Sequence, residues 1–429
     1  MFSRFAKKVD FSVRGSVFQN ILILVLGASS AKLLGFAAIP IITRLYSPED
    51  LGLLAIFASL VSMLLPLTTL RYVIAIPLPR RDEMAINILV LCLGVSSAVT
   101  FLALSLFWIF GSEIFGFFSA EKIAPLWPLL IVGLYAETAF EALTMWATRK
   151  KAFREIARTH IAQSFAGAVT KIGLGLLSAT PGGLIAGQVV QQSGGVVFLL
   201  GRFRTAFSLI SSEVTFKRLR HVFYYYREIP IYRLPSQMVL ILSSQIPLLF
   251  AALVYDIQDV GQISLAFMAI MTPVNLLAQT AGTAFFGEVS RVGRTNPARI
   301  LKITIGVTMR MLIISVLPVL ILLIFGPDLF ELAFGGEWRI AGQYAQLLSI
   351  YLFAQLVTQP TMNVLTIFNK HSIFLRINLY RAAITTIIIF VCYGMELPAD
   401  QFILIFSITM ALFFSLTWLK FVSILRTYL

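Results

Sequence analysis

Charged residues, cysteines and histidines are all scarce in this sequence of 429 residues. Asp, Glu, Lys and Arg together make up 13% of it, and there are two cysteines and three histidines. Cys92 and Cys392 both lie within apolar runs, which gives neither a disulfide framework nor the spacing of a metal site. The sequence also lacks a Gly-Lys dipeptide and an HExxH sequence, so it has no Walker A loop and no zincin site. ATP-driven pumping by this chain alone is therefore excluded.

Long apolar runs recur along the whole sequence. The chain is 58% hydrophobic and has a mean hydropathy of +0.88. Runs of eighteen or more apolar residues can cross a hydrocarbon core about 30 Å thick, and in lipid they must be helical because their backbone groups have no water to bond. We predict an all-α integral membrane protein with spans at about 17–43, 52–78, 85–110, 124–147, 160–179, 183–201, 235–254, 261–286, 301–325, 342–366, 373–394 and 401–419.

The basic residues are distributed unequally between the two sides of these spans. One set of connecting segments, with the span ends beside them, holds 26 of the 34 Lys and Arg residues, and the other set holds three. Because cytoplasmic loops retain positive charge, this bias predicts that both termini are cytoplasmic. It also accounts for the net charge of +14 without a nucleic-acid partner. The basic, amphipathic start of the chain is interpreted as an interfacial segment leading into the first span.

The longest inner segment, residues 202–234, divides the chain into two halves. It contains FKRLRHVFYYYREIP, which predicts a basic and aromatic helix on the membrane surface, against anionic lipid headgroups. We therefore expect a lobe at 1–201, a cytoplasmic linker at 202–234 and a second lobe at 235–429.

The two halves contain similar short sequences in the same order. The matches are LYSPEDLG at 45–52 with VYDIQDVG at 254–261, FGSEIF at 110–115 with FGPDLF at 325–330, and Pro40 and Pro66 with Pro247 and Pro273. Each half has an even number of predicted spans, so the halves have the same orientation. This pattern predicts a parallel repeat of six helices, related by a pseudo-two-fold axis along the membrane normal, as in transporters.

Seven charged residues fall inside the predicted spans. They are the cations Lys32, Arg71, Lys171, Arg310 and Arg381 and the acids Glu137 and Glu141. A charge at the centre of a span costs about 2.5–3.5 kcal/mol on insertion scales, so these residues should face partners or a water-filled cavity. Five cations against two acids leave an excess of positive charge, for which a phosphate is a suitable partner. Arg310 is the weakest of these candidates, because it has few polar neighbours and snorkelling or a bond to a carbonyl would also explain it.

Uncharged polar residues also recur at helical spacing. Gln188, Gln191 and Gln192 form one such stripe, and Gln355, Gln359 and Asn363 form another. We interpret these stripes as walls of a wet cavity that binds sugars. For the charged residues a structural reading stays open, in which Lys32 or Lys171 pairs with Glu137 or Glu141. The two glutamates are the candidates for carrying a coupling proton or sodium ion, with helix packing as the alternative.

Several segments resemble one known family. TRLYSPEDLG, RYVIAIPLPRRDE, KKAFREIARTHIAQS and FGGEWRIAGQYAQLLS, in this order, are similar to segments of Wzx-type polysaccharide flippases of the multidrug/oligosaccharidyl-lipid/polysaccharide exporter superfamily. The resemblance covers almost the whole chain. It implies a MATE-like, V-shaped pair of six-helix lobes in the bacterial inner membrane, moving an undecaprenyl-diphosphate-linked O-antigen, capsule or exopolysaccharide unit outward by alternating access. It further implies cation coupling, no cofactor, a monomer, and contact with lipids and the polysaccharide polymerase machinery.

Under this interpretation Arg71, Lys171 and Arg381, with Lys32 and Arg310, are expected to bind the diphosphate. Two other functions stay open. A multidrug or cation antiporter of the same superfamily would have the same architecture but an acidic cavity. An O-antigen polymerase or membrane glycosyltransferase would need more room outside than the longest predicted outer loop, 326–341, provides. The lipid II flippase branch would add two further spans.

Overall fold

The computed structural model describes residues 14–292, 296–363 and 371–426 of the chain. Within these ranges the elements are helices and the turns between them, and no strand occurs. The long helices are α1 (Arg14–Leu45), α2 (Pro48–Thr68), α3 (Asp82–Phe117), α4 (Trp127–Arg149), α5 (Phe153–Leu177), α6 (Pro181–Ile210), α8 (Leu234–Val254), α9 (Ile257–Val292), α10 (Pro297–Phe334), α11 (Arg339–Thr358), α13 (His371–Gly394) and α14 (Ala399–Arg426). The all-α prediction is confirmed.

Eleven helices in the described part of the chain are long and apolar enough to cross a membrane. The remaining long helix is α5, which carries more polar residues than the others but packs against α1 and α6 inside the bundle. The protein is therefore a multi-pass membrane protein. Its more polar helix is tolerated because protein rather than lipid covers much of its surface.

The boundary of the second predicted span differs most from the structure. We expected a helix over 52–78, whereas α2 begins at Pro48 and ends at Thr68. Leu70 and Arg71 have φ angles of 45° and 62°, and these left-handed conformations take the chain off the helical path. Arg71 is therefore in a turn and not inside a membrane-spanning helix as expected. A second difference is α10, which continues to Phe334, so most of the outer loop expected over 326–341 is helical.

The motif RLYSPEDLG forms a capped corner between α1 and α2. Ser47 is the N-cap residue of α2, and its hydroxyl accepts a hydrogen bond from the Asp50 backbone N–H at 3.3 Å. The Asp50 carboxylate accepts one from the Ser47 backbone N–H at 3.1 Å, which completes a capping box. The corner is also tied to the bundle, because the Tyr46 hydroxyl donates to the Lys171 carbonyl at 2.8 Å.

The helices of the two halves pack in the same pairs, as a repeat predicts. In the first half α1 packs on α5, α2 on α4, α3 on α4, and α4 on α6. In the second half α8 packs on α13, α9 on α11, α10 on α11, and α11 on α14. The corner Tyr255 matches Tyr46, since its hydroxyl donates to the Leu397 carbonyl at 3.0 Å. The short sequence matches therefore mark equivalent joints in two similar six-helix units.

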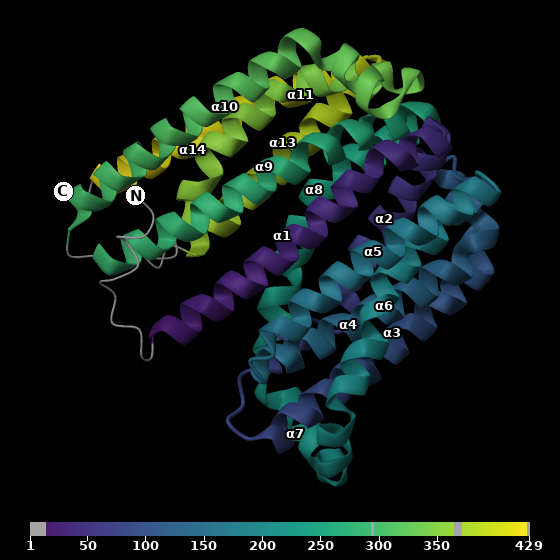
Figure 1. Cartoon of the computed structure of the whole chain (residues 1–429), viewed down its shortest axis with the longest axis vertical. Helices are drawn as coiled ribbons and strands as arrows, with labels where there is room; N and C mark the ends of the chain where they lie inside the picture. The colour runs from purple at the N-terminus through teal and green to yellow at the C-terminus, as the bar shows by residue number, and fades with distance from the viewer. Residues whose placement is uncertain (1–13, 293–295, 364–370, 427–429) are drawn as a thin grey trace.

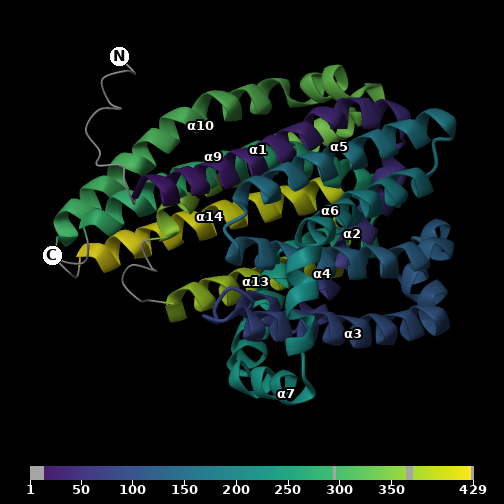
Figure 2. The ribbon, with the colours of Figure 1, turned by 60° about the horizontal axis from the view of Figure 1, so that its bottom comes forward.

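The two units meet at one end of the molecule and diverge at the other (Figure 1). At the closed end the Arg44 guanidinium donates to the Leu332 carbonyl at 3.1 Å, and the Trp338 indole N–H donates to the Thr43 carbonyl at 2.8 Å. At the open end, the first turns of α1 and the last turns of α14 lie far from α7 (Figures 1 and 2). The arrangement is the V shape expected from the resemblance.

The closed end depends on two glycines at equivalent positions of the repeat. A Cβ atom on Gly261 of α9 would lie 1.8 Å from the Pro48 carbonyl oxygen, and one on Gly52 of α2 would lie 2.3 Å from the Ile257 carbonyl oxygen. Neither distance is possible for a real side chain, so only glycine permits the first turns of α2 and α9 to pack backbone against backbone. The glycine shared by the two corner motifs thus has a contact role between the units.

The segment predicted as a surface linker contains a short helix. This helix, α7 (Phe216–Tyr225), is capped by the Thr215 hydroxyl, which accepts a hydrogen bond from the Arg218 backbone N–H at 3.3 Å. The Tyr72 hydroxyl donates to the Phe223 carbonyl at 3.0 Å and holds the helix against the first unit. Phe216, Tyr224 and Tyr225 are exposed, in agreement with an aromatic surface helix. The long helix α6 continues to Ile210 and occupies the first part of the expected linker.

Candidate substrate-binding cavities

A cavity of about 660 Å³ lies between the two units. Its walls come from α1, α2, α5 and α6 on one side and from α9 on the other. Lys32 of α1, Lys171 of α5, and Gln188 and Gln191 of α6 all line it. The structure therefore brings together, in one cavity, two of the predicted phosphate-binding residues and two of the predicted sugar-binding residues.

Lys171 is the most enclosed of these residues, with 9% of its surface exposed. Its ammonium group donates to the side-chain oxygen of Gln188 at 2.9 Å and to that of Gln191 at 3.3 Å. The close approach of α5 to α6 depends on Gly187, since a Cβ there would lie 2.3 Å from the Lys171 Cγ. Among the described residues Lys171 has hydrogen-bond partners but no carboxylate partner, so no acid in the described cavity wall neutralises its positive charge.

A second cavity of about 270 Å³ lies within the other unit, between α8, α9, α11, α13 and α14. The Arg381 guanidinium lines it and donates through Nη2 to the Ser243 hydroxyl at 2.6 Å. The Arg381 Nε and the side-chain oxygen of Gln355, which also lines this cavity, are buried without a hydrogen-bond partner among the described residues. Buried polar atoms of this kind are uncommon, and they suit a site that binds a polar ligand.

Met271 and Asn275 of α9 line both cavities. The two cavities therefore adjoin at one face of α9. Sequence reasoning missed both residues, although Asn275 left a signal, as a polar residue two positions after Pro273 within an otherwise apolar run. Its amide can both donate and accept hydrogen bonds at the boundary between the cavities.

The charge in the two cavities has one sign. Lys32, Lys171 and Arg381 are among the residues that line them, and the described lining residues include no Asp or Glu. In a low-dielectric environment such unbalanced positive charge is costly unless water or an anion is present. These two cavities are therefore the part of the described structure that best fits an anionic ligand.

Arg71 belongs to an ion pair instead. Its guanidinium lies 3.0 Å from the Glu141 carboxylate, and the two side chains are 17% and 23% exposed. Neither residue lines the two cavities. The alternative left open by the sequence paired the embedded acids with Lys32 or Lys171. The partner of Glu141 is instead Arg71, because the turn after α2 directs it toward α4.

The other predicted residues lie outside the two cavities. Arg310 is on an exposed face of α10, and Gln359 accepts a hydrogen bond from the Gln355 amide at 3.1 Å, just beyond the end of α11. Gln192 faces α4, where a Cβ on Gly133 would lie 2.8 Å from its side-chain oxygen. The Asn363 side chain falls outside the described residues. Glu137 is half-buried on α4 and has no ion-pair partner among the described residues.

The Arg71–Glu141 pair makes a stability prediction. Glu141→Gln would leave the Arg71 guanidinium partly buried and unpaired, which costs about 1–3 kcal/mol. We expect a lower midpoint of thermal unfolding in detergent, whereas Glu137→Gln, one turn away on the same helix, should leave the midpoint nearly unchanged. Equal effects of the two substitutions would contradict a specific pairing with Glu141.

A family profile described as polysaccharide biosynthesis protein matches residues 41–342 of this sequence. This chain belongs to that family. The match begins near the end of α1 and ends in the first turn of α11, so it includes Lys171 but neither Lys32 nor Arg381. It agrees with the resemblance to Wzx-type flippases.

This polysaccharide biosynthesis protein shares its fold with solved transporters. The lipid II flippase MurJ in an inward closed conformation aligns with a TM-score of 0.72 at 13% identity, over 92% of this chain and 87% of that chain. The Vibrio cholerae MATE transporter VcmN aligns with a TM-score of 0.57 at 14% identity, over 96% of each chain. A MATE protein in complex with MaL6 gives 0.56 at 14% identity, over 95% of each chain. No curated protein matches in a sequence search. The fold is therefore the MATE-like fold expected from the sequence.

Proposed function

We propose that this protein is a flippase that moves an undecaprenyl-diphosphate-linked oligosaccharide from the inner to the outer leaflet of the bacterial cytoplasmic membrane. Lys171 and Arg381, with Lys32, bind the diphosphate. Gln188, Gln191 and Gln355 bind the sugars, and the lipid tail stays in the membrane beside the gap between the units. Arg71 is reassigned to the ion pair with Glu141, and Arg310 is left out of the site.

The observation that carries the proposal is the charge of the two adjoining cavities. Three cations and no carboxylate are present among their described lining residues. A diphosphate supplies the missing negative charge and accepts the charge-assisted hydrogen bonds that Lys and Arg donate. An antiporter for cationic drugs would need negatively charged cavities, so the same observation disfavours that alternative.

The shape of the molecule supports a direction of access. The units diverge at the end that carries α7 and the ends of α1 and α14 (Figure 1), and the basic connecting segments are at the same end. If positive loops stay inside, this end is cytoplasmic and the V is open to the inner leaflet. The contacts around Gly52 and Gly261 then close the outer end, and transport requires them to separate.

Coupling belongs to the proposal as well. Glu137 is the candidate for binding a coupling proton or sodium ion, because it is half-buried and lacks an ion-pair partner among the described residues. Glu141 is less suited, since its charge is already balanced by Arg71. We propose that the protein works as a monomer and delivers its substrate to the polymerase machinery.

The experiment that tests the function locates the lipid-linked repeat units in cells that lack this protein. We expect whole units to accumulate on the inner leaflet, where an enzyme that cannot cross the membrane fails to modify them until the cells are opened. A strain that lacks the polymerase is the control, since single units then accumulate on the outer leaflet. Normal exposure of the units outside cells lacking this protein would refute the flippase assignment.

A further inference from the structure

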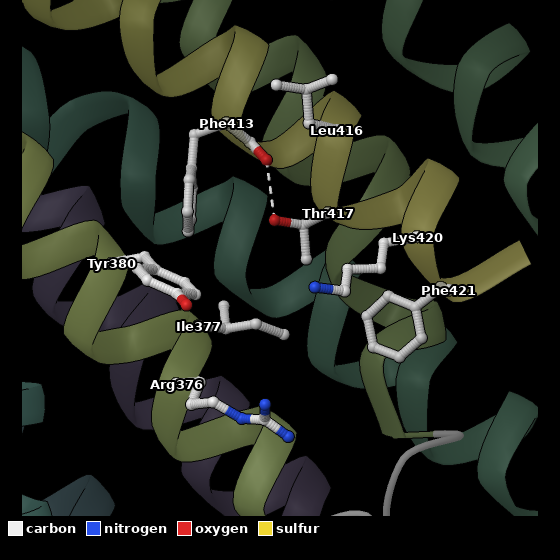
Figure 3. Close-up of a pocket in the computed structure, with 8 residues that line it drawn as sticks. All are labelled: Arg376, Ile377, Tyr380, Phe413, Leu416, Thr417, Lys420 and Phe421. Atoms are coloured by element: carbon white, nitrogen blue, oxygen red, sulfur yellow. Dashed lines mark hydrogen bonds between the residues drawn. The ribbon is translucent and has the colours of Figure 1, made fainter. Parts of the chain in front are cut away.

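A groove between α13 and α14 lies apart from the two cavities of the proposed site. Its volume is about 200 Å³, and its walls are mostly apolar, with Ile377 and Tyr380 on α13 and Phe413, Leu416 and Phe421 on α14 (Figure 3). Tyr380 and Leu416 are 57% and 64% exposed, so the groove opens to the outside of the bundle. In a membrane protein an exposed and mostly apolar surface of this kind is suited to contact with lipid.

Two cations stand at the edge of this apolar groove. Arg376 extends from α13 and Lys420 from α14, and their charged ends face the same space beside Phe421 (Figure 3). The described lining residues include no Asp or Glu. Both residues lie toward the open end of the molecule, near the first turns of α13 and the last turns of α14. Two basic groups above an apolar floor match the phosphate and the acyl chain of an acidic lipid.

The groove and the inner cavity both involve α13 and α14, but they share no lining residue. Tyr380 lines the groove, whereas the next residue, Arg381, lines the inner cavity and donates to Ser243. Successive residues of an α-helix point about 100° apart, so Arg376 and Arg381, five residues apart, point in directions that differ by about 140°. Arg376 and Arg381 thus serve different spaces.

We propose that the α13–α14 groove is a binding site for an anionic phospholipid of the surrounding bilayer, with its phosphate between Arg376 and Lys420 and an acyl chain along Phe413 and Leu416. The bound lipid bridges the two helices at the open end of the V. This assignment does not depend on what the protein transports.

The site can be tested by native mass spectrometry of the purified full-length protein with phosphatidylglycerol and phosphatidylcholine as probes. The wild type should retain phosphatidylglycerol preferentially. The double variant Arg376→Gln with Lys420→Gln should lose about tenfold or more of this preference, because each basic residue near a headgroup contributes about 1 kcal/mol. The matched control is Arg299→Gln with Lys302→Gln, which removes the same charge from exposed positions at the start of α10.

A second variant tests whether the shape of the groove, and not positive charge alone, retains the lipid. Leu416→Trp keeps both cations but fills the groove from an exposed position, and it should also lower phosphatidylglycerol retention. The proposal would be overturned if the α10 control lost as much preference for phosphatidylglycerol as the groove variant, or if Leu416→Trp retained phosphatidylglycerol fully. If equimolar undecaprenyl diphosphate displaced phosphatidylglycerol from the groove, the groove would be a site for the carrier lipid, and the proposal would be overturned.

Discussion

Gly261→Val is expected to stop the two units from meeting at their closed end and to abolish most transport. The added Cβ would lie 1.8 Å from the Pro48 carbonyl oxygen, which belongs to the capped first turn of α2 and cannot rotate away. Overpacking of this kind costs about 3 kcal/mol at the upper end of the usual range. That corresponds to a fall of about a hundredfold in the population of the closed arrangement. Gly52→Val should act in the same direction, since its Cβ would meet the Ile257 carbonyl oxygen.

The closed end can be measured with spin labels at Glu113→Cys and Asp328→Cys, exposed residues on α3 and α10. In Gly261→Val the distance between the labels should be longer and more widely distributed than in the otherwise unchanged protein. Gly287→Val is the matched control, because it lies on the same helix and its Cβ would meet nothing within 4 Å. An unchanged distance distribution in Gly261→Val would refute a closing role for this contact.

Removing the cavity cations is expected to have the second large effect. Lys171→Gln and Arg381→Gln should each lower surface polysaccharide about tenfold to a hundredfold, since hydrogen bonds to charged groups contribute about 1.5–3 kcal/mol. Lys171→Arg and Arg381→Lys should restore part of the activity, because the charge is kept while the geometry changes. The measurement is surface polysaccharide in a deletion strain carrying each variant, corrected for the amount of protein in the membrane.

Arg310→Ala provides the comparison, because the same charge is removed from an exposed face of α10, outside both cavities. It should leave surface polysaccharide near the wild-type level. Full activity of Lys171→Ala, Arg381→Ala and Lys32→Ala at normal expression would refute diphosphate binding by these residues. Equal loss in Arg310→Ala would show that embedded positive charge matters wherever it lies.

An embedded charge was placed correctly from the sequence only where the helix that carries it was also predicted correctly. Lys171 and Arg381 were expected to face a cavity because they are charges inside predicted spans, and both line cavities, since α5 and α13 are regular through those positions. Arg71 was misplaced because nothing in its apolar surroundings signalled the end of α2 at Thr68. Its partner Glu141 is seventy residues away in the sequence, and such a pairing follows from packing rather than from local spacing.

The cavity between the units could not be predicted from the sequence of one unit alone. Asn275 is separated from Lys171 and from Arg381 by about a hundred residues, yet it lines a cavity with each of them. No periodicity within one helix indicates which face another helix will cover. Gln192 shows the same limit, because it is next to Gln191 in sequence but points toward α4.

The sequence by itself determined the class of this protein, its membrane location, its repeat and the excess of embedded positive charge. These follow from composition and from the period of the helix, which are local properties set by the backbone's need for hydrogen bonds in lipid. The tertiary structure decided which cations are balanced and which remain available, because electrostatic pairing acts over a few ångströms and joins residues that are distant in the chain. It also gave the shared glycine of the two corner motifs its role, since only the meeting of α2 with α9 brings Gly52 and Gly261 into contact.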